Sequence, residues 1–336
     1  IGRPERLYTV TISVMAALKV LFDDNWTSVY FGLNLVWTGL LLGMLCHSAR
    51  MLEVSWLAIA ALLPLVLLSA DFMYWPHYVL SDTFFAFLLM LAVWWLVFTL
   101  TRPNPSLRVR SALLSGALLL IGLIAFARPT SAPYAGSLLL FVLLLPLAVH
   151  RWRPAWVGVG LMLTVVVLAV AYGLLIQIYL ETDWLGRSRE LGSIARFAGE
   201  GRVVWDRPET AVEHVGGWLG YAQVFLVRFL TFWSPYAESF SVEHLIANAV
   251  ITLVFLCAVG AWLTGACGSE RAACSIALLV VGMSCAAAVF HSVVFIDYDW
   301  RYRFPVIAPL FLLSMLLLDR VAVRILPKAT VGARRA

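Results

Sequence analysis

The chain has 336 residues, of which 62% are hydrophobic and only 13% are charged. Soluble proteins carry about 25% charged residues, so this chain has too few charges to cover a water-exposed surface. The composition excludes a soluble globular protein and predicts an integral membrane protein. The net charge of +5 does not indicate nucleic-acid binding, because the basic residues lie in short segments between apolar runs rather than in one patch.

Nine apolar runs are long enough to predict membrane-spanning helices, since a helix needs about 20 residues to cross the hydrocarbon core. They are Val29–Cys46, Leu52–Ala70, Leu80–Leu100, Ser111–Phe126, Ala132–Val149, Trp156–Tyr179, Leu245–Leu263, Ala273–Phe295 and Phe304–Leu318. Two shorter runs, Leu7–Phe22 and Trp218–Trp233, each contain one basic residue, which favours helices that lie in the membrane interface. The sequence thus predicts an all-α integral membrane protein with about nine transmembrane helices and two interfacial helices.

Arginines follow the first, third, fifth, seventh and ninth runs, and alternation puts all of these loops on one side. Because loops rich in Lys and Arg stay in the cytoplasm, that side is predicted to be cytoplasmic. The predicted regions are an external interfacial helix and lead-in (1–28), six transmembrane helices (29–179), an extracytoplasmic loop with an interfacial helix (180–244), three transmembrane helices (245–326) and a basic cytoplasmic tail (327–336). The expected location is a bacterial inner (plasma) membrane. One further span before Ile1 would bring both ends of the protein to the cytoplasm, and we expect such a segment.

Charged groups at the external ends of the spans are the candidate functional residues, because charges near a membrane are costly. Asp82 begins the third span, just after the aromatic segment that contains His77 and Tyr78. One interpretation is that Ser81 or Asp82 caps the helix; the other is that Asp82 faces an external cavity lined by His77 and Tyr78. Arg128, in a short external turn, is interpreted either as reaching lipid headgroups or as binding an anion.

The segment before the last span carries two acids and two arginines, Asp297, Asp299, Arg301 and Arg303, around Tyr302. These charges pair with one another in one interpretation and hold a phosphate group in the other. The long external loop of mixed charge is interpreted as a solvated cap, with a functional lid as the alternative. The histidines and cysteines show no metal-site spacing, so we predict no metal site. No cofactor is predicted, and a requirement for a divalent cation is left open.

Five segments in order resemble the motifs of one enzyme family, the GT-C class of membrane glycosyltransferases. They are the start of the chain to Asn34, YVLSDTFF at Tyr78–Phe85, ARPT at Ala127–Thr130, RFLTFWSPY at Arg228–Tyr236 and RYRFPVIAP at Arg301–Pro309. Within this class, the chain resembles the branch of dolichyl-phosphate-mannose protein mannosyltransferases and lipid A aminoarabinose transferases. Together these segments run in order over nearly the whole chain.

The resemblance implies that a sugar moves with inversion from a polyprenyl-phosphate donor to a hydroxyl of a lipid, glycan or protein acceptor. Asp82 matches the second acidic position of the family and is the candidate catalytic carboxylate. Arg301, Arg303 and Arg128 are candidates for the donor phosphate, and Tyr302 is a candidate cavity residue. The principal acid of the family belongs to the first external loop, upstream of Ile1, so we expect the main catalytic base to lie outside this sequence.

Three other interpretations remain open. A lipid or small-molecule transporter would need polar residues at mid-membrane depth, whereas the spans are nearly free of charge. An enzyme similar to O-antigen ligases or polymerases would use Arg187, Arg189 and His214 of the long loop. A non-catalytic membrane subunit of a larger complex would need none of these residues for transfer.

Overall fold

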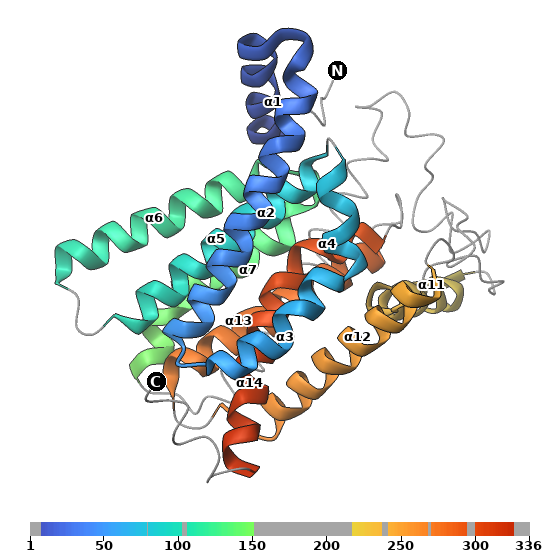
Figure 1. Ribbon diagram of the computed structural model, residues 1–336. Coiled ribbons are helices and arrows are strands. Elements are labelled where there is room, and N and C mark those ends of the chain that lie inside the picture. The colour runs from blue at the N-terminus through green and yellow to red at the C-terminus, as the bar shows by residue number, and fades with distance from the viewer. Residues whose placement is uncertain are drawn as a thin grey trace.

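A computed structural model describes residues 8–78, 80–102, 106–150, 217–236, 241–267, 270–293 and 300–325. All regular structure in these segments is helical, which confirms the predicted all-α class. The α-helices are α1 (Thr9–Phe22), α2 (Trp26–Met51), α3 (Trp56–Leu68), α4 (Ala70–Tyr74), α5 (Ser81–Thr101), α6 (Leu107–Ala125), α7 (Ala132–His150), α11 (Gly217–Trp233), α12 (Val242–Leu263), α13 (Arg271–Val293) and α14 (Phe304–Ile325). Figure 1 shows most of them side by side in one bundle.

Five helical segments of the described chain are long and apolar enough to cross a membrane. They are Thr9–Met51, Ser81–Thr101, Val242–Leu263, Arg271–Ser292 and Phe304–Ile325. Three shorter apolar helices, Trp56–Leu68, Ser111–Ala125 and Ala132–Leu143, coincide with further predicted spans. The chain is therefore a helical membrane protein, and the predicted span Trp156–Tyr179 lies outside the described residues.

Helix α14 forms the centre of the bundle and packs against α2, α3, α5, α12 and α13. Its side chains are buried almost without interruption from Phe304 to Leu317. Helix α12 has the opposite character, because one face packs on α14 while Leu253, Leu256 and Leu263 are at least 60% exposed. Exposed leucines on a helix of this length face lipid in a membrane protein.

The bundle has two ends, where the helices begin and terminate. We name them the Asp82 end and the Arg50 end, after one residue at each. The Asp82 end contains the start of α5, α7, α12 and α14 and the last turns of α6 and α13. At the Arg50 end, Ser55 caps α3, and its hydroxyl donates to Asp319 Oδ1 of α14 over 2.5 Å. This carboxylate ties the beginning of α3 to the central helix and complements the α3 dipole.

The two segments predicted to be interfacial, Leu7–Phe22 and Trp218–Trp233, form helices α1 and α11. Neither is a simple isolated helix with its basic residue exposed. Helix α1 continues through the short 3₁₀ helix Asp23–Asn25 into α2, and the two form a hairpin that extends beyond the rest of the bundle (Figure 1). Helix α11 buries its one arginine, Arg228, which is only 1% exposed. The short apolar run located helix α11, but it could not show that the basic residue of this helix is buried.

Candidate functional site

Five charged side chains are buried together with aromatic rings at the Asp82 end of the bundle. They are Asp71, Asp82, Arg128, Arg228 and Arg303, and none is more than 7% exposed. Burying a charge is costly unless it is paired, so a group of this kind is unusual in a structural core. We call it the charged cluster. Within the described part of the chain it contains three arginines and two acids, and guanidinium groups are suited to binding an anionic group.

Asp82 and Arg128 form the first ion pair of the cluster. Arg128 Nη1, between α6 and α7, donates to Asp82 Oδ1 in the first turn of α5. The residue that caps α5 is Leu80, and no side chain accepts a capping hydrogen bond there. The interpretation of Ser81 or Asp82 as the helix cap is therefore wrong. Asp82 instead orients the guanidinium of Arg128, a relationship that neither motif indicated.

Asp71 and Arg303 form the second ion pair, with 3.3 Å between Arg303 Nε and Asp71 Oδ2. Arg303 Nη1 also donates to the carbonyl oxygen of Ser234, which follows α11. The sequence suggested Asp297 and Asp299 as partners of this arginine, and both lie outside the described residues. Asp71 was missed, although an acid at the end of an apolar run beside an aromatic cluster is the same signal that identified Asp82.

Tyr302 belongs to a column of stacked groups that begins at Arg128. Arg128 lies over the Tyr302 ring with 5.3 Å between Cζ and the ring centroid, which is cation–π geometry. The other partner of Tyr302 is the His291 ring of α13, stacked at 4.4 Å and 10°, and Phe232 of α11 stacks on His291 at 6.0 Å. Tyr134 of α7 donates to the Tyr302 carbonyl oxygen over 3.0 Å. The column therefore brings side chains of α11, α13 and the 3₁₀ helix Trp300–Arg303 together, with Tyr302 in contact with Arg128.

Two side chains of α2 hold the segment that leads into Asp82. Tyr30 donates its hydroxyl proton to the carbonyl oxygen of Leu80 over 2.9 Å. Asn34 Nδ2 donates to the carbonyl oxygens of Tyr78 (2.8 Å) and Pro76 (3.3 Å). The donating side chains of Tyr30 and Asn34 are both fully buried. They fix the backbone that places Asp82 against Arg128.

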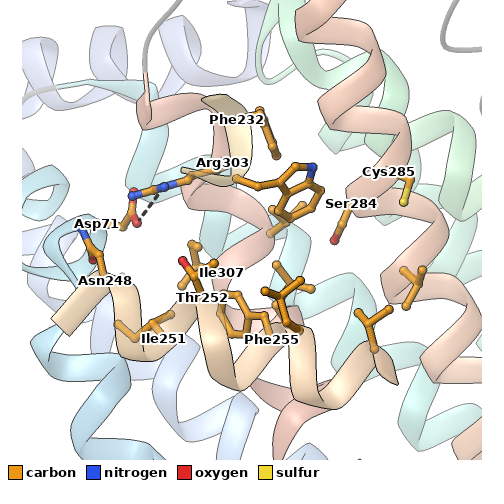
Figure 2. A pocket seen from close by; sticks show the side chains of 16 residues that line it. Asp71, Phe232, Asn248, Ile251, Thr252, Phe255, Ser284, Cys285, Arg303 and Ile307 are labelled. Atoms are coloured by element: carbon orange, nitrogen blue, oxygen red, sulfur yellow. Dashed lines mark ion pairs between the residues drawn. The ribbon is translucent and has the colours of Figure 1, made fainter. Parts of the chain in front are cut away.

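An apolar cavity of about 230 Å³ lies next to the charged cluster, between α11, α12, α13 and α14. Figure 2 shows Asp71 and Arg303 at one edge of this cavity, with their ion pair drawn as a dashed line. The rest of the wall consists mainly of aliphatic and aromatic side chains, among them Phe232, Ile251, Phe255 and Ile307. A charged edge beside an apolar volume is suited to an amphiphile.

The remaining predicted site residues lie in different places. His77 and Tyr78 are exposed and do not line the cavity; His77 stacks on Phe31 of α2 at 5.9 Å. Arg301 belongs to the short 3₁₀ helix Trp300–Arg303, and its side chain lies outside the described part of the structure. The structure thus brings Asp82, Arg128, Tyr302 and Arg303 together and adds four residues that the sequence did not single out. These are Asp71, Arg228, His291 and Tyr134.

No group of three or more His, Cys, Asp or Glu side chains that could hold a metal ion occurs among the described residues. The charged cluster is instead rich in arginine, the side chain best suited to phosphate and carboxylate groups. Comparisons with protein families, with curated proteins and with solved structures find no match to this chain. The functional argument therefore depends on the cluster and the cavity.

Proposed function

We propose that this protein is a membrane glycosyltransferase of the GT-C class, with about nine transmembrane helices in the complete topology. In this proposal it transfers a sugar from a polyprenyl-phosphate donor to an acceptor hydroxyl. The Asp82 end lies on the extracytoplasmic side and the Arg50 end in the cytoplasm, as the arginine bias of the loops favours. The observation that carries the proposal is the charged cluster, with its arginines, at the edge of an apolar cavity.

The chemistry of such a transfer matches what the cluster offers. The acceptor oxygen forms a bond to the anomeric carbon, the bond from that carbon to the phosphate oxygen breaks, and the configuration inverts. Negative charge grows on the leaving phosphate, and guanidinium groups placed beforehand in a dry site stabilise it. Arg128 is the proposed contact of this leaving phosphate. A carboxylate is required to take the proton of the acceptor hydroxyl.

Asp82 has a more specific proposed role than the resemblance implied. Its carboxylate already accepts a hydrogen bond from Arg128, so we assign it as a positioning residue for this guanidinium. Tyr302 has a related role, because its ring lies against Arg128. Both residues act on the leaving group through Arg128 rather than on the acceptor.

The test is sugar transfer in liposomes that contain the purified protein and labelled polyprenyl-phosphate sugars. Arg128→Gln should lower kcat about 100-fold or more, since loss of one charge-stabilising donor costs that much in comparable sites. Arg324→Gln is the matched control, because Arg324 lies at the Arg50 end, where it donates to the carbonyl oxygens of Gly265 and Ala266 in the turn after α12. If Arg128→Gln transferred sugar at the wild-type rate, the assignment of Arg128 to the donor phosphate would be wrong. A wild-type protein that binds the donor but never transfers the sugar would instead indicate a non-catalytic subunit.

A further inference from the structure

The cavity wall is not uniformly apolar. Asn248 and Thr252, one turn apart on α12, and Ser284 on α13 place polar side chains along it. Figure 2 shows Ser284 across the cavity from the Asp71–Arg303 edge, while Thr252 lies nearer to that edge. The cavity therefore has a charged edge and, deeper in the bundle, a second level of hydrogen-bonding groups.

The Ser284 hydroxyl gives the strongest indication that the cavity binds a polar ligand group. A buried helical serine usually donates to the carbonyl four residues earlier, as Ser292 does to Ala288 (2.6 Å) and Ser314 to Leu310 (2.9 Å). Ser284 is 1% exposed, and its Oγ finds no hydrogen-bond partner within the described segments. An unsatisfied buried hydroxyl costs about 1–3 kcal/mol, so a ligand that accepts a hydrogen bond at this depth would be favoured.

The spacing of polar groups distinguishes between two classes of lipid. A polyprenyl phosphate has only hydrocarbon beyond its phosphate, and offers nothing to Ser284. An acyl-ester phospholipid has a phosphate and, a few bonds deeper, two ester carbonyl groups that accept hydrogen bonds. Such a lipid matches Arg303 at the edge and the hydroxyls of Ser284 and Thr252 farther in.

The cavity can be reached from the bilayer along α12. Leu256 lines the cavity and is nevertheless 65% exposed, so the same side chain meets both the cavity and the lipid-facing surface. The acyl chains of a bound lipid could thus continue into the membrane while its ester groups lie inside the wall.

We propose that this cavity binds an acyl-ester phospholipid with a hydroxyl-bearing headgroup, which is the sugar acceptor. Arg303 binds its phosphate, Asp71 accepts a hydrogen bond from the headgroup hydroxyl, and Ser284 and Thr252 donate to the ester carbonyls. The acceptor role rests on the proposed transferase function. The binding site itself does not, because binding requires no donor.

Binding can be measured with Cys285, which lines the cavity next to Ser284 (Figure 2). In a variant whose other cysteines are replaced by alanine, the rate of N-ethylmaleimide labelling reports occupancy. The probes are phosphatidylglycerol, its dialkyl-ether analogue without ester carbonyls, and a polyprenyl phosphate. We expect phosphatidylglycerol to slow labelling and the ether analogue to bind about three- to tenfold more weakly, the range for loss of a hydrogen bond.

Substitutions in the cavity wall test whether its hydroxyl groups cause the difference in binding between ester and ether lipids. Ser284→Ala and the near-isosteric Thr252→Val should reduce the difference between ester and ether lipids, whereas Ser314→Ala should leave it unchanged, since Ser314 lies outside the cavity. Equal protection by ester and ether lipids, or equal protection by polyprenyl phosphate, would overturn the binding site. Protection without any sugar transfer would leave the binding site standing and refute the transferase. Transfer to other acceptors but not to phosphatidylglycerol would overturn only the acceptor role.

Discussion

Arg128 and Asp82 are 46 positions apart in the chain, yet they form an ion pair in which neither residue is more than 4% exposed. Removing one partner of a buried pair leaves an uncompensated charge and costs about 3–5 kcal/mol. Asp82→Asn should therefore lower the stability of the folded protein by about this amount, measured as thermal unfolding in detergent.

The double variant Asp82→Asn with Arg128→Gln separates the stability lost by breaking the ion pair from the stability lost through each substitution by itself. Because it removes both charges, it should recover a large part of the stability that either single variant loses. Additive losses from the two substitutions would contradict the pairing.

Gly116 of α6 allows the close approach of Trp95 from α5. A Cβ atom at position 116 would lie 2.5 Å from Trp95 Cζ2, and the Trp95 indole is held in place by a 2.8 Å hydrogen bond to the Leu113 carbonyl oxygen. Gly116→Ala should destabilise the protein by about 1–3 kcal/mol through overpacking. Gly122→Ala on the same helix meets nothing within 4 Å and should be neutral or stabilising in the same unfolding measurement.

Asn34 should control the mobility of the 3₁₀ helix Trp75–His77, because it donates to two carbonyl oxygens around this helix. In Asn34→Leu we expect faster amide hydrogen exchange there and lower transfer activity, since Asp82 is positioned through the same segment. Tyr30→Phe removes a single hydrogen bond and should have a smaller effect. If amide exchange were unchanged in Asn34→Leu, other contacts would hold the Trp75–His77 helix in place.

Cys267, in the turn after α12, should be a slow target for thiol reagents. A hydrogen bond with Cys274 and burial raise the pKa of the Cys267 thiol above its ordinary value. Since the thiolate is the reactive form, maleimide labelling of Cys267 should stay slow at pH 8 and increase only at more alkaline pH. Cys274→Ala removes the first cause, so it should increase the labelling rate at pH 8, while Cys285→Ala should not. Peptide mass spectrometry gives the rate for each cysteine.

The helices could be predicted because a run of apolar residues long enough to cross a bilayer is visible without tertiary information. Asp82, Arg128 and Arg303 could be selected because charges at the ends of such runs are rare. The pairing of these charges could not be predicted, since Asp71 and Arg303 belong to distant segments and meet only when α14 packs in the centre. Ser284 gave no signal, because a serine in an apolar helix ordinarily satisfies its own hydroxyl, and only the structure shows that this one does not.

Position 302 contributes to the Arg128 site in two chemically separate ways, through the face of its ring and through its backbone carbonyl oxygen. The carbonyl contact with Tyr134 survives any substitution that leaves the backbone in place, but the contact with Arg128 requires an aromatic ring. In homologous proteins this position should therefore vary among Tyr, Phe and Trp, whereas an aliphatic residue should be found only where position 128 has also lost its arginine.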